Sequence, residues 1–321
     1  MDGGAQASSG EHYLAHPMPG PKPMLLHSLV EFDELIHACL EAADARTVLE
    51  IGAESGASTA RLLAAVSERG GGLWCVEPGP TRELQDLDAG EEAFHLVDGL
   101  SPWALEGLPR CDAYVIDGDH NYWTVTRELE HVAGGDAFPL TLLHDVAWPC
   151  ARRDQYYSPE ALPPEGVHEH TWELGSVPGV AEAVAGGFRG RGSFAVAVHE
   201  GGERNGVRTA VEDFAVQHGG LRFAVIPAVF GLGVLYSSDA PYASELAALL
   251  APYDGNPLLE RLEGNRLELY LALLRTSQDV AELGLRQGRL LAEYDAAIAR
   301  SETDAAALRA EVAGLRERLA E

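Results

Sequence analysis

Along the first half of the chain, short apolar runs alternate with segments in which hydrophobic residues recur at helical spacing. Five short apolar runs predict buried strands at residues 47–51, 73–76, 94–97, 113–116 and 140–143. Helical spacing of apolar residues precedes the first run, at about residues 25–45, and recurs between runs, for example over 57–66 and 122–132. Apolar strands separated by helices predict a buried parallel sheet with right-handed crossover connections.

The pattern breaks down from residue 146 to about residue 206, a stretch rich in Pro, Gly, His, Trp, Tyr and Arg. A segment that long without periodicity, inside a compact domain, predicts a functional lid. Its arginines and aromatic residues, such as Arg152, Arg153 and Tyr157, would either clamp a polar, ring-containing ligand or serve only the packing and surface ion pairs of the lid. A helix over 207–218 follows, and then strands over 222–226 and 233–236. These strands are too close in sequence for a crossover helix, so we expect an antiparallel hairpin.

The C-terminal part is helical in composition beyond Pro257, and a heptad pattern starts at Gln287. Eight of its ten seam positions from Gln287 to Leu319 are apolar, which favours a coiled coil over a long helix that packs back on its own domain. The first 24 residues lack periodicity and predict a flexible tail. The expected division is therefore a tail over 1–24, one α/β domain over 25–254, and a helical segment over 255–321 that forms a homo-oligomer.

Composition narrows the classes of function. The 321 residues contain 23 Lys and Arg against 50 Asp and Glu, a formal net charge of −27, which argues against binding to nucleic acid or to an anionic membrane. Lys22 is the single lysine, so a lysine base deep in a site is nearly excluded. The four cysteines form no CxxC pair, the N-terminus lacks a signal-peptide pattern, and the longest apolar run is broken by Pro227 and glycines. These features predict a cytoplasmic protein with reduced thiols and no membrane span.

The first candidate site follows the first predicted strand, in the sequence VLEIGAESGAST at residues 48–59. Gly52 and Gly56 would allow a ligand to approach the backbone closely at the carboxyl edge of the sheet. Their spacing differs from the dinucleotide fingerprint G-x-G-x-x-G. Because the carboxylates of Glu50 and Glu54 flank the turn and would repel a pyrophosphate, a ligand with a cationic or amino group fits better.

The next two strands also end in acids. Glu77 is placed to accept hydrogen bonds from ribose hydroxyls, and Asp98, followed by Gly99, to meet an adenine amino group. Each acid alone is more commonly a cap of a helix or loop. Together, at successive strand ends, they favour an adenosine-type cofactor.

These residues, Glu50-x-Gly52-x-x-x-Gly56, Glu77 and Asp98-Gly99, together with the hairpin, resemble class I S-adenosylmethionine-dependent methyltransferases over about residues 25–239. The resemblance implies an α/β, Rossmann-like, doubly wound sheet of seven strands in the order 3-2-1-4-5-7-6, with the last strand antiparallel. It also implies S-adenosylmethionine lying over the first two turns. The cofactor-binding residues that it implies are Glu50, Gly52, Ala53, Gly56, Ser58, Glu77, Asp98, Gly99 and Asp117.

Two further motifs end the fourth and fifth strands: VIDGDHNY at 115–122 and LLHDV at 142–146. Neighbouring parallel strands should bring their acids and histidines together at one edge: Asp117, Asp119, His120, His144 and Asp145. Carboxylates with an imidazole suit a divalent cation, Mg²⁺ or Mn²⁺ best, while the histidine also tolerates Zn²⁺ or Fe²⁺.

This pair of motifs is similar to that of metal-assisted O-methyltransferases acting on sugars and other secondary metabolites, including those of antibiotic biosynthesis. The resemblance implies Asp117, His144 and Asp145 as metal ligands, with His144 standing where many members carry Asp or Glu, and Mg²⁺ as the first choice of ion. It also implies a sugar hydroxyl or phenol of a small molecule as acceptor. With lysine unavailable, the predicted general base is His120, whose unperturbed pKa lies near neutrality, and then Asp119.

Two other functions remain open from the sequence. A metal-dependent hydrolase would use the His and Asp residues but would leave the glycine turn and Glu77 without a ligand. A non-catalytic assembly protein would display a degenerate cofactor-binding domain on a coiled coil.

Overall fold

The computed structural model describes residues 29–320, and the tail predicted over 1–24 lies outside them. Its centre is a seven-stranded sheet in which β12 runs antiparallel to both of its neighbours. In spatial order the strands are β3 (Phe94–Asp98), β2 (Gly72–Glu77), β1 (Thr47–Ile51), β4 (Ala113–Ile116), β5 (Leu140–His144), β12 (Leu232–Ser237) and β11 (Leu221–Ile226). This order confirms the predicted 3-2-1-4-5-7-6 arrangement and the predicted hairpin.

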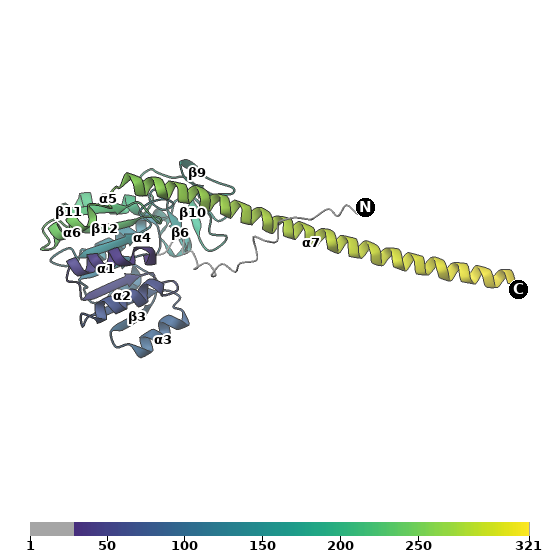
Figure 1. Ribbon diagram of the computed structural model, residues 1–321, viewed down its shortest axis with the longest axis horizontal. Helices are drawn as coiled ribbons and strands as arrows, with labels where there is room; N and C mark the ends of the chain where they lie inside the picture. The colour runs from purple at the N-terminus through teal and green to yellow at the C-terminus, as the bar shows by residue number, and fades with distance from the viewer. Residues whose placement is uncertain (1–28, 321) are drawn as a thin grey trace, which may run out of the picture.

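Helices cover both faces of the sheet (Figure 1). One face carries α1 (Asp33–Ala42, preceded by the 3₁₀ turn η2, Leu29–Phe32), α2 (Ala57–Ser67), α3 (Arg82–Gly90) and α6 (Ala243–Leu250). The other carries α4 (Tyr122–Val132) and α5 (Val207–His218), and the short η3 (Trp103–Leu105) follows β3. Successive residues of β1 point to opposite faces, so Val48 packs in the first core and Leu49 in the second. Two apolar faces explain why the strands read as continuous hydrophobic runs.

The segment predicted as an irregular lid is a small folded unit, which corrects the prediction. It contains a three-stranded sheet and a two-stranded sheet, in addition to two 3₁₀ turns. Its elements are β6 (Gln155–Tyr156), η4 (Pro159–Ala161), η5 (Pro164–Gly166), β7 (His170–Thr171), β8 (Gly175–Val177), β9 (Val180–Val184) and β10 (Ala195–Ala197). Strands of two to five residues are too short to show a clear period in the sequence.

The fully buried Arg153 organises the lid. Its guanidinium donates hydrogen bonds to the carbonyl oxygens of Ala197 and Val198 at the end of β10, and of Val180 and Ala181 in β9. Hydrogen bonds from the two terminal nitrogens of this buried guanidinium to backbone oxygens hold the otherwise short strands together.

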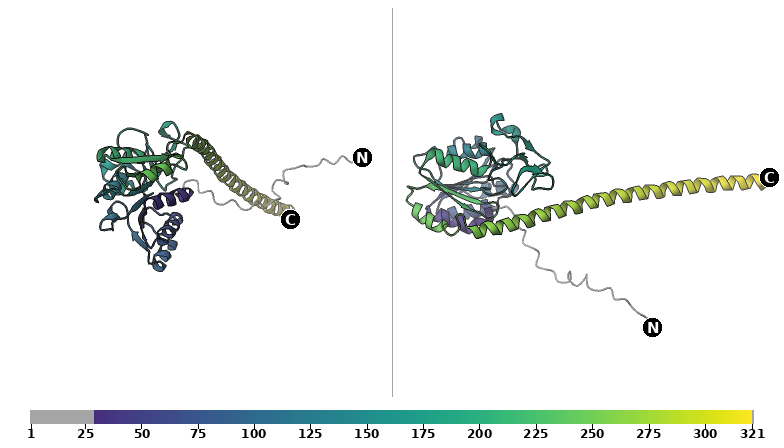
Figure 2. Two further views of the ribbon diagram at one scale, coloured as in Figure 1. Left: turned by 60° about the vertical axis from the view of Figure 1, so that its left-hand side comes forward. Right: turned by 90° about the horizontal axis from the view of Figure 1, so that it is seen from above.

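The last helix, α7 (Pro257–Ala320), is 64 residues long. Its root, residues 257–275, packs on the body, where Leu267 and Leu271 are buried and Arg275 Nε donates to Gly186 O. The rest projects away from the body, as Figures 1 and 2 show. At 1.5 Å per residue this free part is about 70 Å long. No helix within residues 29–320 is apolar enough over a sufficient length to cross a membrane.

Candidate active site

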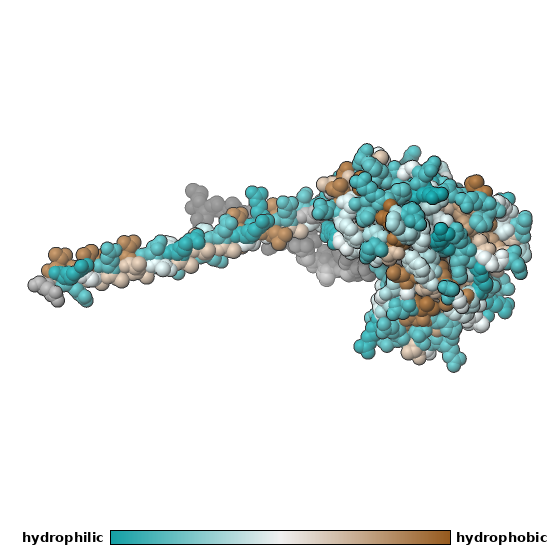
Figure 3. Space-filling model, turned by 180° about the vertical axis from the view of Figure 1, so that it is seen from behind, coloured by the Kyte–Doolittle hydropathy of each residue, from teal (hydrophilic) through white to brown (hydrophobic). Residues whose placement is uncertain are grey.

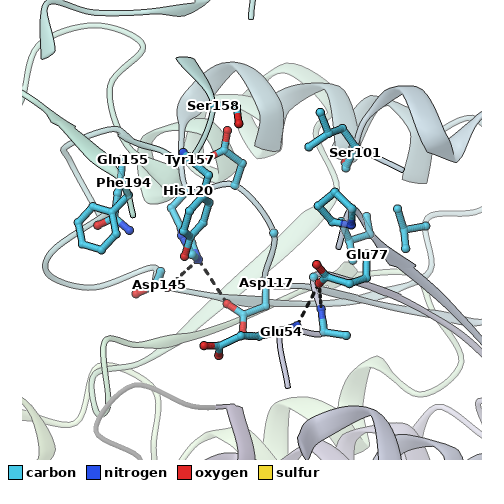
Figure 4. Close-up of a pocket in the computed structure, with 18 of the residues that line it drawn as sticks. Glu54, Glu77, Ser101, Asp117, His120, Asp145, Gln155, Tyr157, Ser158 and Phe194 are labelled. Atoms are coloured by element: carbon cyan, nitrogen blue, oxygen red, sulfur yellow. Dashed lines mark hydrogen bonds and ion pairs between the residues drawn. The ribbon is translucent and has the colours of Figure 1, made fainter. Parts of the chain in front are cut away.

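A cavity of about 680 Å³ lies at the carboxyl ends of β1, β2, β4 and β5, between the sheet and the lid (Figure 4). This edge of an open α/β sheet is where ligands bind, and the volume is in the range typical of small-molecule sites. Nine of the predicted site residues line it: Gly52, Ala53, Ser58, Glu77, Gly99, Asp117, Asp119, His120 and Asp145. Four do not line it: Glu50, Gly56, Asp98 and His144.

The glycine turn after β1 is shaped by contacts within the protein. Gly52 has φ +85°, and a Cβ there would lie 2.2 Å from the carbonyl oxygen of Asp117. A Cβ on Gly56, at φ +79°, would lie 2.9 Å from Leu84 Cδ2. Close approach of the chain itself therefore requires glycine at both positions, while Gly52 also lines the cavity.

Glu77 holds this turn from the neighbouring strand. Its Oε2 accepts hydrogen bonds from the backbone N–H groups of Ala53 (2.9 Å) and Glu54 (3.0 Å), and its Oε1 accepts one from Gly79. Figure 4 shows the carboxylate at the wall of the cavity. A carboxylate has about four acceptor positions, so Glu77 retains capacity for a ligand hydroxyl while it caps the turn.

Glu50 and Asp98 do not face the cavity, contrary to prediction. Glu50 is fully buried beneath the turn, where Oε1 accepts a hydrogen bond from Ser58 Oγ at 2.6 Å, and burial raises the pKa of its carboxyl to about 7. Asp98 is exposed at the end of β3, the outermost strand of its side of the sheet. The wall near β3 is formed instead by Gly99, Leu100, Ser101 and Trp103.

Asp117, His120, His144 and Asp145 form one cluster, as the two motifs predict. The Nε2 atom of His120 lies 2.8 Å from Asp145 Oδ2 and 3.3 Å from Asp117 Oδ1. The Nδ1 atom of His144 lies 3.1 Å from Asp117 Oδ1 and 3.4 Å from Asp145 Oδ2. His144 is buried behind the two carboxylates, and Figure 4 shows His120 between them and the lid. Two imidazole nitrogens thus converge on two carboxylates.

The tautomer of His144 follows from its other nitrogen, because Nε2 lies 3.0 Å from the carbonyl oxygen of Val229, which can only accept. Nε2 therefore carries a proton, and a neutral His144 presents the lone pair of Nδ1 to Asp117 and Asp145. That arrangement is repulsive unless a proton or a cation lies between them. The donor atoms of Asp117, His144 and Asp145 all lie within 4.8 Å of one another, so this set fits a divalent cation.

Protonation of the cluster corrects one premise of the sequence analysis. Burial lowers the pKa of His120, but the carboxylates of Asp145 and Asp117 outweigh it and raise that pKa to about 10. The same two carboxylates overcome burial and raise the pKa of His144 well above its usual value, while the pKa of Asp145 is lowered. The expectation that His120 has a pKa near neutrality is wrong for this environment.

Asp119, the second predicted base, lines the cavity beside His120. It accepts hydrogen bonds from Asn121 Nδ2 (2.7 Å) and from the backbone N–H of Tyr157 (3.1 Å). Burial raises the pKa of its carboxyl to about 6, so Asp119 is mostly ionised above that pH.

The lid contributes aromatic rings rather than arginines to the cavity. Tyr157, Phe188 and Phe194 line it, and Phe230 joins them from the turn between β11 and β12. Arg152 pairs with Glu212 on α5 instead. The aromatic residues scattered through 146–206 were the sequence signal for this wall, but Phe188, Phe194 and Phe230 were not singled out because no period marks them.

Comparison with known proteins gives one family match. Residues 49–134, from β1 to the end of α4, match a family model described as a methyltransferase domain. Among curated proteins, none matches the sequence.

Several solved structures are similar to this one. A Staphylococcus aureus protein provisionally assigned as a caffeoyl-CoA O-methyltransferase has a TM-score of 0.41 and 13% identity, over 64% of this chain and 83% of that one. The O-methyltransferase from Bacillus cereus, in complex with SAH, has a TM-score of 0.40 and 14% identity, over 65% of this chain and 81% of that one. The O-methyltransferase TomG from Streptomyces achromogenes, in complex with SAM, has a TM-score of 0.40 and 14% identity, over 66% of this chain and 82% of that one.

The order of the seven strands confirms the sheet that the resemblance implies, and residues 49–134 match a family model described as a methyltransferase domain, in agreement with the family that the sequence motifs resemble.

Proposed function

We propose that the protein is an S-adenosylmethionine-dependent O-methyltransferase that methylates a hydroxyl of a small molecule, a sugar or phenolic group of a secondary metabolite, with the assistance of a divalent cation. The observation that carries the proposal is a single cavity with two chemically different ends. The glycine turn and Glu77 form one end, and Asp117, Asp119, His120 and Asp145 form the other. A hydrolase would leave the first end without a ligand.

S-adenosylmethionine supplies a methyl group on a positively charged sulfonium. The residues proposed to bind it are the predicted cofactor residues that line the cavity: Gly52, Ala53, Ser58, Glu77 and Gly99 at the turn end, and Asp117 from the other end. Glu77 keeps the turn in place and accepts from ligand hydroxyls, while the acidic walls attract the cationic sulfonium. Glu50 and Gly56 support this end from outside the cavity wall, whereas Asp98 is exposed to solvent.

The residues proposed to hold the cation are Asp117, His144 and Asp145. When bound, the cation would orient the acceptor hydroxyl, lower its pKa, and neutralise the carboxylates that hold a proton on His120. His144 is kept in the tautomer that offers Nδ1 by its contact with Val229 O. Such a second contact is what fixes a ligating imidazole.

His120 or Asp119 takes the proton of the acceptor hydroxyl. In His120, Nε2 faces Asp145 and Asp117, which leaves Nδ1 as the accepting atom. Nδ1 is buried and has no hydrogen-bond partner in the part of the chain that the structure describes. Asp119 offers a carboxylate at the same wall. Replacing the true base, by His120→Ala or Asp119→Asn, should lower kcat by about 10²- to 10⁴-fold.

The test is release of S-adenosylhomocysteine during turnover on a panel of hydroxylated sugars and phenols, with and without EDTA. The proposal expects methylation that EDTA abolishes and Mg²⁺ restores. Turnover unaffected by EDTA would remove the cation from the proposal, and cleavage of an acceptor without S-adenosylmethionine would favour the hydrolase.

We also propose that the free part of α7 pairs with a second copy of this chain as a parallel, two-stranded coiled coil. An apolar stripe runs along it, visible in Figure 3, and nothing within residues 29–320 covers it. The exposed members of the stripe are Leu291, Tyr294, Ile298, Leu308, Val312, Leu315 and Leu319. β-Branched residues at one seam position, Ile298 and Val312, with leucine at the other, favour two parallel strands.

Charges beside the stripe match the same partner. In a parallel, in-register pair of helices, Asp304 of one copy faces Arg309 of the other, and Glu311 faces Arg316. All these contacts are attractive, and symmetry doubles them. Sedimentation equilibrium of the full chain should give a dimer, and a chain that ends at Asp279, which keeps the root of α7, should give a monomer. A monomeric full chain would contradict the coiled coil.

A further inference from the structure

The acceptor end of the cavity has an aromatic wall. The ring centroids of Phe188 and Phe194 lie 5.6 Å apart, and those of Phe188 and Phe230 lie 5.7 Å apart. Tyr157 meets Phe194 edge to face at 6.2 Å. These four rings come from the lid and from the turn after β11, and Figure 4 shows Tyr157 and Phe194 on the same side as His120. Such a wall suits a flat apolar ring, which stacks on aromatic faces at low entropic cost.

The remaining charged groups of the cavity are almost all negative. Carboxylates line it from the ends of β1, β2, β4 and β5: Glu54, Glu77, Asp117, Asp119 and Asp145. Among the lining residues in the described part of the chain there is no lysine or arginine, and His120 is the single group able to carry a positive charge. The walls stay net negative even when a divalent cation, a sulfonium and a protonated His120 are counted against the five carboxylates.

Three arginines near this end are engaged elsewhere. Arg153 is buried against backbone carbonyls of the lid, and Arg152 binds Glu212 at 2.6 Å. Arg266 lies over the Phe230 ring, 5.0 Å from its centroid, and pairs with Glu263. Turning any of them toward the cavity would break these contacts and leave a buried or half-buried acceptor without its partner.

We propose that the acceptor carries a flat aromatic ring and is uncharged or cationic, and that acceptors bearing carboxylate, phosphate or coenzyme A groups are excluded. This inference rests on the proposed function, and it narrows the acceptor class within it. An anionic acceptor would be repelled by the carboxylates with no arginine or lysine to pair with it. A cationic one is attracted by the same carboxylates and by the faces of the aromatic rings.

The test uses three ligands that share one dihydroxyphenyl ring and differ in charge: dopamine, 4-methylcatechol and 3,4-dihydroxyphenylacetate. Each is titrated calorimetrically into the full chain saturated with S-adenosylhomocysteine. The proposal expects 3,4-dihydroxyphenylacetate to bind at least tenfold more weakly than 4-methylcatechol, and dopamine to bind at least as tightly as 4-methylcatechol. Binding of 3,4-dihydroxyphenylacetate as tight as that of 4-methylcatechol, or tighter, would overturn the exclusion of anionic acceptors. Failure of all three ligands to bind would overturn the proposal that the acceptor carries an aromatic ring.

A variant locates the effect in the cavity. Glu54→Gln removes one exposed carboxylate at the wall. One charge at about 6 Å in water changes the affinity of a singly charged ligand by about threefold, in opposite directions for dopamine and 3,4-dihydroxyphenylacetate, so their ratio should narrow by about tenfold. Glu83→Gln, an exposed acid on α3 outside the cavity, is the matched control and should leave the ratio unchanged. An unchanged ratio in Glu54→Gln would contradict the assigned wall. Failure of S-adenosylhomocysteine itself to bind would instead count against the proposed function.

Discussion

Glu263 on α7 should hold the acceptor end of the cavity together. Its Oε1 accepts a hydrogen bond from the backbone N–H of Phe230 at 3.0 Å, and Arg266 binds both of its oxygens at 2.6 Å. The turn that it holds is strained, since Val229 and Phe230 have φ of +46° and +64°, a region that costs side chains of this kind about 1–3 kcal/mol each. Val229 O accepts from His144, and Phe230 lines the cavity. The root of α7 therefore supports both the cluster and the aromatic wall.

Glu263→Ala removes a charged hydrogen bond to a buried N–H, and such bonds contribute about 1.5–3 kcal/mol. We expect the free energy of unfolding in urea to fall by about 2 kcal/mol, roughly 30-fold in the folding equilibrium. Binding of a ring-bearing acceptor should weaken while binding of S-adenosylhomocysteine stays unchanged, because Phe230 borders only the acceptor end.

The matched control is Glu260→Ala, an exposed glutamate three residues earlier in the same helix, which should change stability by less than about 0.5 kcal/mol. If Glu263→Ala proved as mild as this control in both assays, the idea that α7 restrains the strained turn would be refuted.

Three further predictions concern other parts of the molecule. Burial raises the pKa of Glu128 from its ordinary 4.5 to about 8, so between these pH values the native state binds more protons than the unfolded chain. Relative to the unaltered protein, Glu128→Gln should therefore become progressively more stable from about pH 5 to 8, by roughly 2–4 kcal/mol in the free energy of unfolding in urea. A stability difference that does not change with pH would contradict this. Gly52→Ala should abolish binding of S-adenosylmethionine in calorimetry, because the added Cβ would clash with the carbonyl oxygen of Asp117. The control is Gly70→Ala, which is also at positive φ but has no atom within 4 Å of the added Cβ, and it should bind normally. Equal binding by both variants would refute the steric argument. Arg316→Glu should shift the dimer toward monomer in sedimentation, and Glu311→Arg in the same chain should restore it, whereas no rescue would count against the parallel register.

The sheet was predictable because its strands are buried on both faces. Continuous apolar runs bounded by turn residues gave the limits of β1 and β4, and the helical spacing gave those of α5. The lid strands were not predictable in this way. They are held by the buried Arg153 and by contacts between residues distant in sequence, so the local hydrophobic pattern does not predict them.

The acids at the strand ends were predictable as a group, but their individual orientations were not. Glu50 lies one residue before the end of β1, so its side chain points to the same face as Val48, under α2, where Ser58 binds it. Asp98 ends an edge strand and turns to solvent. The pKa of His120 also depends on the distance between two strand ends, which no spacing in the sequence encodes.

The central claim is that S-adenosylmethionine binds at the glycine turn and Glu77. Calorimetric titration of the full chain with S-adenosylmethionine tests it most directly, with Glu77→Gln as the variant and Glu83→Gln as the control. The account predicts one site per chain, with affinity at least tenfold weaker in Glu77→Gln and unchanged in Glu83→Gln. No binding by the unaltered chain, or equal binding by all three proteins, would contradict it.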